Sequence, residues 1–230
     1  MTPRILLFDI DGTLIGSGGA GRRALERAVA EACGLDAVSA AFSFAGGTDP
    51  AIFRRLLADC GVEPTEAALA RTFDVYLEIL REEIASAENF LVYPGMEDAL
   101  ETLAAQDPET VAVGLGTGNI EAGARIKLAR ADLNRHFPFG GFGSDAEDRP
   151  ALLRAGALRG AARLGRAPEE CDVLVIGDTP LDVAAAHAIG ARCLAVATGG
   201  ATRAELAAAG PDALVGSMAE SGALDALLGG

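Results

Sequence analysis

The chain has little positive charge and no long apolar run, and each shortage excludes a class of protein. Its 230 residues carry a formal net charge of -14 at pH 7, which argues against nucleic acid or an anionic membrane as a partner, because both bind basic surfaces. No apolar run approaches the roughly 18 residues of a membrane-spanning helix, and no signal peptide precedes the first apolar segment. We therefore expect a cytoplasmic protein.

Cysteine and lysine are also scarce. The four cysteines stand far apart, with no CxxC pair and no histidine at ligand spacing, so a zinc site is not expected. We interpret them as reduced residues, mostly in the core. Lys127 is the only lysine, and the other basic residues are arginines.

An apolar segment near the N-terminus, residues 5–8, leads directly into two carboxylates, Asp9 and Asp11. A short continuous apolar run predicts a strand that is buried on both faces. Asp9 is then expected at the carboxyl end of a central strand, where open α/β sheets place their ligands. Two neighbouring acids repel each other unless a cation lies between them, and a divalent metal ion is the simplest candidate.

Residues 15–88 are expected to contain only helices. The glycine-rich segment 16–21 lacks the spacing of a dinucleotide-binding loop, and we interpret it as a hinge. Amphipathic helical patterns follow at 22–34, 49–60 and 65–87. These patterns predict an inserted helical unit over 15–88, with the core domain formed by 1–14 and 89–230.

After this insertion, strands and helices alternate. The expected strands lie at 111–116, 139–143, 173–177, 192–197 and 213–215. Strands separated by helices predict a parallel sheet with helices on both faces, and hence an α/β fold.

Polar groups follow four of the predicted strands, and parallel connections bring these four strand ends to one edge of the sheet. They are, in chain order, Asp9 with Asp11, Thr117 with Gly118 and Asn119, Arg149, and Asp178 with Asp182. Acids, a hydroxyl and a cation in separate places predict a site for a phosphate and a metal ion.

Phosphoryl transfer needs a nucleophile, a general acid and positive charge around the phosphoryl oxygens. Asp9 suits the nucleophile, through an aspartyl phosphate, and Asp11 suits the acid that protonates the leaving oxygen and later takes a proton from water. Asp178 supplies a further carboxylate for Mg²⁺, and Asp182, one helical turn away, suits a supporting role.

The phosphate itself is expected to bind beside the second strand. Thr117 and the backbone N–H groups of Gly118 and Asn119 can hold phosphoryl oxygens at a helix N-terminus. Arg149 can offset charge in the transition state.

Together these motifs resemble those of the haloacid dehalogenase-like hydrolase superfamily. The matching stretches are Asp9-Ile10-Asp11-Gly12-Thr13-Leu14, the strand ending in Thr117, a basic residue before a helix, and Gly177-Asp178-Thr179-Pro180-Leu181-Asp182. The helical insertion resembles the cap of the phosphoglycolate phosphatase-like branch. The resemblance implies a Rossmann-like core with an α-helical cap, and Mg²⁺-dependent hydrolysis of a small phosphate monoester. It also implies that the side chains of Asp9 and Asp178 and the main-chain carbonyl of Asp11 bind the metal.

One position departs from the family pattern. The third motif usually has a lysine, often followed by proline, whereas this chain has Arg149-Pro150. Arginine is a wide fork with a different reach, and Arg154 on the same helix is the weaker candidate. Lys127, on the helix after Thr117, is expected to be a surface residue.

Several other activities remain to be weighed. The dehalogenases of the superfamily lack the second acid, so Asp11 argues against that activity, and the phosphonate-cleaving members use a cap lysine, which 15–88 lacks. A hexose-phosphate mutase keeps both acids and a similar cap and stays the alternative. A non-catalytic binding module on this fold is less favoured.

Substrate choice is expected to depend on the cap. Thr48 and Asp49 can face the leaving group, and Arg22 can contact a substrate carboxylate or a second phosphate, although exposed arginines are usually solvated. We interpret His136 and His187 as structural. A small phosphorylated metabolite is the expected partner, bound by a monomer or weak dimer.

Overall fold

The structure is a computed structural model that describes residues 2–229. Its main sheet has the strand order β5-β4-β1-β6-β7-β8, and a separate ribbon pairs β2 with β3. The strands are β1 Arg4–Phe8, β2 Ile15–Gly16, β3 Leu91–Val92, β4 Val111–Thr117, β5 Gly140–Phe142, β6 Asp172–Gly177, β7 Arg192–Val196 and β8 Ala213–Val215. The helices are α1 Ala20–Cys33, α2 Asp49–Asp59, α3 Glu66–Ser86, α4 Met96–Ala104, α5 Glu121–Ala129, α6 Arg149–Leu164, α7 Pro180–Ala188, α8 Arg203–Ala209 and α9 Ala223–Leu228, with 3-10 turns at Leu133–His136 and Pro168–Glu170.

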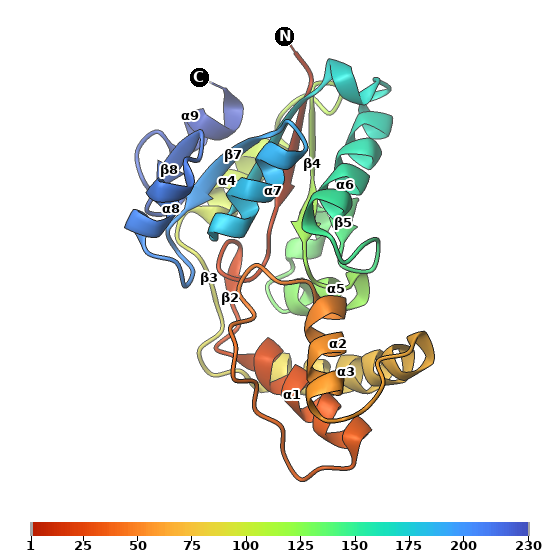
Figure 1. The fold of residues 1–230 in the computed structure, drawn as a ribbon. Coiled ribbons are helices and arrows are strands. Elements are labelled where there is room, and N and C mark those ends of the chain that lie inside the picture. The colour runs from red at the N-terminus through yellow and green to blue at the C-terminus, as the bar shows by residue number, and fades with distance from the viewer. Residues whose placement is uncertain (1, 230) are drawn as a thin grey trace.

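Strand β1 lies in the middle of the parallel sheet because its side chains are apolar on both faces. Leu6 and Phe8 pack with α4, α5 and α9 on one face, while Ile5 and Leu7 pack with α6, α7 and α8 on the other. The chain is thus folded as a sheet between two helical layers (Figure 1). The predicted α/β fold with a parallel sheet flanked by helices is confirmed.

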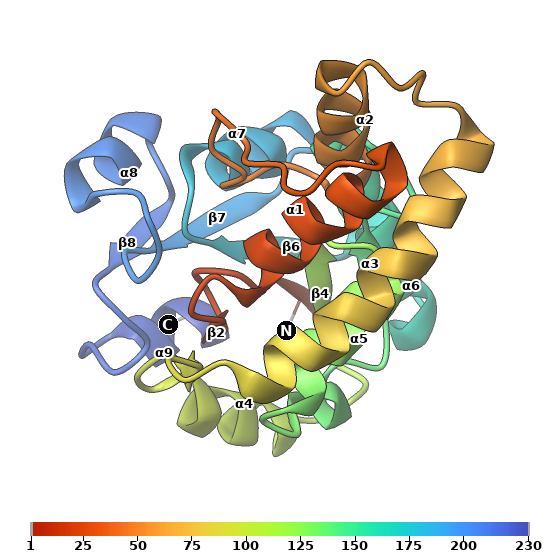
Figure 2. The same cartoon turned by 90° about the horizontal axis from the view of Figure 1, so that it is seen from below.

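Helices α1, α2 and α3 form a second packed unit beyond the carboxyl ends of the strands, at the opposite end of the molecule from both chain termini (Figure 1). Their apolar faces share a core of their own, in which the rings of Phe53 and Tyr76 meet edge to face with centroids 5.2 Å apart. Seen from below, α1 and α3 cross the strand ends side by side (Figure 2). The active-site candidates of the sheet edge therefore lie between two separately packed units.

The expectation that residues 15–88 contain only helices is wrong. Ile15 and Gly16 form strand β2, which pairs in antiparallel fashion with Leu91 and Val92 of β3. At β2 the chain leaves the core for the helical unit, and at β3 it returns. The two segments pair because each supplies hydrogen-bond partners for the backbone N–H and C=O groups of the other. A pairing of two residues has too little length to show a period in the sequence.

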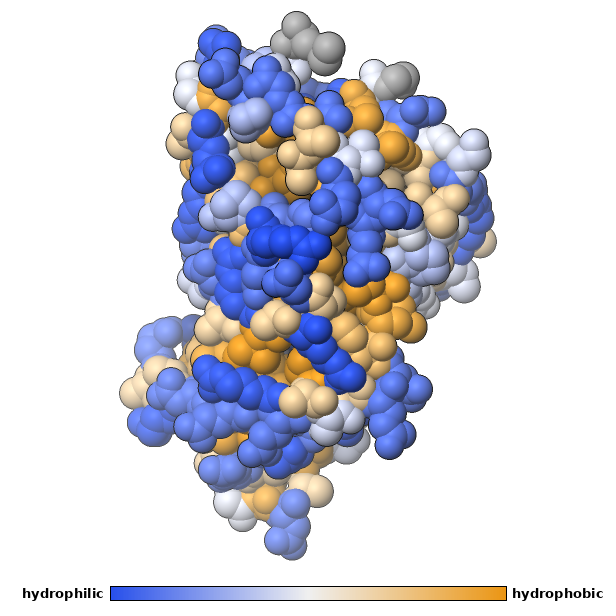
Figure 3. Space-filling view, turned by 180° about the vertical axis from the view of Figure 1, so that it is seen from behind, coloured by the Kyte–Doolittle hydropathy of each residue, from blue (hydrophilic) through white to orange (hydrophobic). Residues whose placement is uncertain are grey.

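The face of the molecule opposite the view of Figure 1 carries both polar and apolar side chains (Figure 3). Viewed from behind, apolar side chains are visible at the narrowing between the sheet part and the helical part (Figure 3). Within residues 2–229, no helix combines the length and the hydropathy that a membrane crossing requires.

Candidate active site

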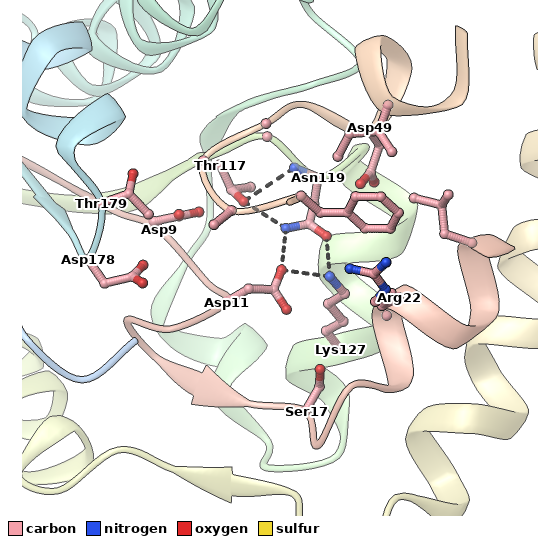
Figure 4. Close-up of a pocket in the computed structure, with 18 of the residues that line it drawn as sticks. Asp9, Asp11, Ser17, Arg22, Asp49, Thr117, Asn119, Lys127, Asp178 and Thr179 are labelled. Carbon is pink, nitrogen blue, oxygen red and sulfur yellow. Dashed lines mark hydrogen bonds and ion pairs between the residues drawn. The ribbon is translucent and has the colours of Figure 1, made fainter. Parts of the chain in front are cut away.

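Asp9, Thr117 and Asp178 come together at the carboxyl edge of the sheet. Asp9 follows β1, and this strand pairs with both β4, which ends at Thr117, and β6, which Asp178 follows. The three residues line a cavity of about 230 Å³. Its other walls come from α1, α2, α3, the loop before α2 and Lys127 of α5, so the cavity lies between the sheet and the helical unit (Figure 4).

Arg149, the first residue of α6, is buried and points into this edge of the sheet. Its Nη2 donates to Asp9 Oδ2 at 2.8 Å and to Asp182 Oδ1 at 2.5 Å, and its Nε donates to the same Asp182 oxygen at 2.9 Å. Arg154 is exposed and donates to the carbonyl of Ala188. The geometry therefore places Arg149, and not Arg154, beside the candidate nucleophile.

Asp182 is held on both of its oxygens. Arg149 occupies Oδ1, and Oδ2 accepts from the backbone N–H of Thr179 at 3.0 Å and from its hydroxyl at 2.7 Å. A carboxylate with four such donors is already engaged, which leaves it to orient the guanidinium rather than to bind a ligand.

Asp9, Asp178 and Asp182 form a compact acidic cluster. One carboxylate oxygen from each lies within 4.8 Å of the others. Burial raises the pKa of Asp178 to about 8, and the charges of Asp9 and Asp182 add to this effect. Burial also raises the pKa of Asp9 to about 6, against the opposing pull of Arg149.

The cluster fits a hard divalent cation. Asp178 accepts a hydrogen bond from Thr13 Oγ1 at 3.1 Å, which leaves its other oxygen, together with one carboxylate oxygen of Asp9 in the same cluster, as hard donors of the kind that Mg²⁺ prefers. A cation between Asp9 and Asp178 would offset the negative charge that burial disfavours on both carboxylates, and the charge of Asp9 that further raises the pKa of Asp178. Asp182 takes no part, because arginine and threonine already hold it.

Thr117, Gly118 and Asn119 form the wall between the two units. Thr117 is fully buried, and its Oγ1 accepts from Asn119 Nδ2 at 2.8 Å. The carbonyl of Gly118 accepts from the backbone N–H of Asp49 at 2.8 Å. A side chain at Gly118 would bring its Cβ within 2.1 Å of the Gly47 carbonyl oxygen, so the helical unit docks directly on this loop.

The expectation that Lys127 is a surface residue is wrong. It is 4% exposed and lines the cavity, where its Nζ donates to Asp11 Oδ2 and to Asn119 Oδ1, both at 2.6 Å (Figure 4). Burial alone would lower the pKa of Lys127, but the charges of Asp11 and Asp49 outweigh it and raise the pKa. A signal was present in the sequence, since Ile120, Ala124 and Lys127 fall on one face of a helix by spacings of four and three.

Of the three expected cap residues, two line the cavity. Arg22 does so while its guanidinium donates to Glu26 and to the carbonyl of Ala40. Asp49 is buried and accepts from the backbone N–H of Ile120 at 2.9 Å, and burial raises its pKa to about 6. Thr48 does not line the cavity, because its hydroxyl donates to the carbonyl of Glu147. The geometry thus gives no support to a substrate contact at Thr48.

Ser17 and Tyr76 are among the cavity residues that were absent from the sequence-based set. Ser17 lies in the glycine-rich segment, and Tyr76 belongs to the apolar stripe of α3. Neither has a motif of its own, and only packing of α1 and α3 over the strand ends brings them to the cavity.

Comparison with known proteins agrees with this geometry. Residues 6–196 match the family model described as haloacid dehalogenase-like hydrolase. Phosphoglycolate phosphatase 1 of Pseudomonas aeruginosa is 31% identical over 207 residues, which cover 86% of this chain and 70% of that protein. A phosphoglycolate phosphatase of Cereibacter sphaeroides is 32% identical over 194 residues, which cover 81% and 82% of the two chains.

Solved structures share the fold. CbbY from Rhodobacter sphaeroides, in complex with phosphate, superposes with a TM-score of 0.72 at 23% identity and covers 97% of this chain and 99% of its own. A hydrolase from Pseudomonas syringae has a TM-score of 0.66 at 23% identity and covers 94% of both chains.

Proposed function

The chain belongs to the haloacid dehalogenase-like hydrolase family, and from this premise we propose that it is a Mg²⁺-dependent phosphatase acting on a small phosphate monoester. Two curated relatives carry the name phosphoglycolate phosphatase at 31% and 32% identity, and phosphoglycolate is therefore the first substrate to test. A cavity of about 230 Å³ suits a ligand of that size, since pockets for drug-sized ligands are larger, at about 300–1,000 Å³.

The observation that carries the proposal is the contact of Arg149 with Asp9. The guanidinium holds Asp9 Oδ2 at 2.8 Å, which leaves Oδ1 as the candidate nucleophilic atom. The same guanidinium supplies a fixed positive charge beside the reacting phosphorus, where phosphoryl transfer gains most from it.

The metal would be held by the side chains of Asp9 and Asp178 and by the main-chain carbonyl of Asp11. When bound, Mg²⁺ supplies positive charge to the phosphoryl oxygens. Asp182 keeps Arg149 in place, and Thr13 orients Asp178 through its hydroxyl.

The chain's own residues account for both halves of the reaction. Asp9 Oδ1 attacks phosphorus, the bond from phosphorus to the leaving oxygen breaks, and Asp11 gives that oxygen a proton. Asp11 then takes a proton from water as the water attacks the phosphorylated Asp9. This second step releases inorganic phosphate, restores the carboxylate of Asp9 and returns Asp11 to its protonated form. In this proposal Thr117 and the backbone of Gly118 hold phosphoryl oxygens.

The helical unit would act as a cap that covers the site. Asp49, Thr48 and Gly46 each make a hydrogen bond to the core at the edge of the cavity, so the structure corresponds to a covered site from which water is partly excluded. The segments 17–21 and 93–95 flank the β2–β3 ribbon and are the proposed hinges. A crosslink between the two units that leaves turnover unchanged would refute this movement.

The test is phosphate release from a panel of esters with Mg²⁺. The panel contains phosphoglycolate, sugar phosphates, nucleotides and an aryl phosphate, and wild type runs beside Asp9→Asn and an EDTA control. We expect release that both controls abolish. Release that survives Asp9→Asn would overturn the nucleophile, and interconversion of sugar-phosphate isomers without release would favour the mutase.

A further inference from the structure

Lys127, Asn119 and Asp11 form a closed network on the helical-unit side of the candidate nucleophile (Figure 4). Lys127 Nζ donates to Asp11 Oδ2 and to Asn119 Oδ1, each at 2.6 Å. Asn119 Nδ2 donates to the same Asp11 oxygen at 2.9 Å and to Thr117 Oγ1 at 2.8 Å. Lys127 is almost completely buried, whereas the side chain of Asp11 is 42% exposed to the cavity side.

The directions of these hydrogen bonds follow from the chemistry of lysine. An ammonium has three donors and no acceptor, so the Asn119 atom that faces Lys127 has to be its oxygen. The amide nitrogen of Asn119 must then point toward Asp11 and Thr117. A single cation thereby sets the orientation of the amide.

The consequence for Asp11 concerns which oxygen can carry a proton. Both neighbours of Oδ2 are donors, so a proton on that oxygen would face two other hydrogens. The proton that Asp11 must carry as a general acid is therefore confined to Oδ1, for which no hydrogen bond to residues 2–229 is formed. Thr117 is affected in the same way, because its Oγ1 accepts from Asn119 and its own hydrogen is left to donate elsewhere.

We propose that Lys127 is a positioning residue that, through Asn119 and by direct contact, directs the acidic proton of Asp11 to the oxygen facing the leaving group. The proposal rests on the phosphatase activity proposed above. Lys127 acts through Asp11, so in kcat/KM, which reports the first chemical step, its effect is expected only with leaving groups that need a proton.

The experiment compares kcat/KM for two leaving groups in wild type and Lys127→Met. Phosphoglycolate releases an alkoxide that needs a proton, whereas 2,4-dinitrophenyl phosphate releases a stable phenolate that needs none. The quantity kcat/KM reports the transfer to Asp9, before the hydrolysis step that all substrates share. The ratio of the two values is independent of the folded fraction, so partial misfolding of the variant does not affect it.

We expect Lys127→Met to lower kcat/KM for phosphoglycolate about 100-fold, the lower end of what a general acid contributes, and to change the value for the aryl ester less than about threefold. Arg125→Met, on the same helix and with contacts outside the cavity, is the matched control and should leave the ratio unchanged. The double variant Asp11→Asn/Lys127→Met should be no slower on phosphoglycolate than Asp11→Asn alone, because Lys127 acts through Asp11.

Three results would overturn the positioning role. An equal loss on both esters would assign Lys127 to phosphate binding or folding. A loss confined to KM, and seen with phosphoglycolate but not with ethyl phosphate, which lacks a carboxylate, would make it a contact to the substrate carboxylate. A further loss in the double variant would show that it acts apart from Asp11. Absence of turnover by wild type on every ester would instead refute the phosphatase proposal itself.

Discussion

Replacement of Asp178 by asparagine should stabilise the metal-free protein at neutral pH and remove its response to Mg²⁺. Burial, and next the charge of Asp9, raise the pKa of Asp178 from 3.8 to about 8 in the folded protein. As the pH rises above 3.8, the unfolded chain releases this proton, while the folded chain keeps it until about pH 8. The free energy of unfolding therefore falls as the pH rises through this window.

The magnitude follows from the width of the window. At pH 7 the unfolded carboxyl lies about three pH units above its pKa, which corresponds to a cost of about 4 kcal/mol at 1.36 kcal/mol per unit. This value is an upper limit, because Asp9 titrates in the same range and adjusts to its neighbour. Asparagine keeps the acceptor for Thr13 Oγ1, 3.1 Å away, and has nearly the same shape.

The assay is urea unfolding between pH 4 and pH 8, first in EDTA and then with Mg²⁺. We expect Asp178→Asn to exceed wild type by up to about 4 kcal/mol at pH 7 and by nothing at pH 4. A saturating 100-fold excess of Mg²⁺ over its Kd should stabilise wild type by about 2.7 kcal/mol, and the variant by far less.

Asp145→Asn is the control with the opposite sign. Hydrogen bonds from Arg159 lower the pKa of Asp145, so its ionised form stabilises the fold above its unfolded pKa and this contribution is lost as the pH falls. The control variant should therefore be less stable than wild type at pH 7 and equal to it at low pH. If Asp178→Asn were destabilised by a constant amount from pH 4 to 8, or still responded fully to Mg²⁺, the electrostatic reasoning about this cluster would be wrong.

Three further predictions concern the border of the two units and the arginine. Burial raises the pKa of Asp49 to about 6, so the free energy of unfolding of wild type should fall as the pH rises from 4 to 6. Asp49→Asn should be more stable than wild type by up to about 3 kcal/mol at pH 7 and equally stable at pH 4, as measured by urea unfolding over this range. Gly118→Ala would place a Cβ 2.1 Å from the Gly47 carbonyl oxygen and should lower kcat/KM for the best ester about 10-fold or more by displacing the loop. The control Gly200→Ala adds a Cβ with no neighbouring atom within 4 Å and should leave kcat/KM unchanged. Arg149→Lys keeps the charge but loses the paired contact with Asp182 and should lower kcat by about 10- to 100-fold. An unaltered kcat, or an equal loss of kcat in Arg154→Lys, would contradict the placement of Arg149.

The sheet and its polar edge could be predicted because the signals are local. The run that ends at Asp9 is apolar at every position, so it had to be a strand covered on both faces, and β1 lies between β4 and β6. Alternation of strands and helices makes the sheet parallel, and a parallel sheet places Asp9, Thr117 and Asp178 on one edge whatever the loops do.

The cavity side of the site could not be derived in this way. Lys127 and Tyr76 are buried at the cavity because α5 and α3 pack against each other beside the strand ends. A helical pattern in the sequence shows which residues share a face, but not which element packs against that face. Thr48 shows the opposite error. Its place beside a glycine-rich loop predicted a contact with substrate, but its hydroxyl donates to the carbonyl of Glu147 in the core.

The α/β fold, the order of the motifs and the acids and cation that they carry could be predicted from the sequence alone, because these depend on neighbours along the chain and on a period of two or of three to four residues. The three-dimensional packing was needed to show which oxygen of Asp11 is held, which basic residue lies beside Asp9 and which side chains close the cavity. Those contacts join residues more than 100 positions apart, and their distances depend on how two separately packed units meet.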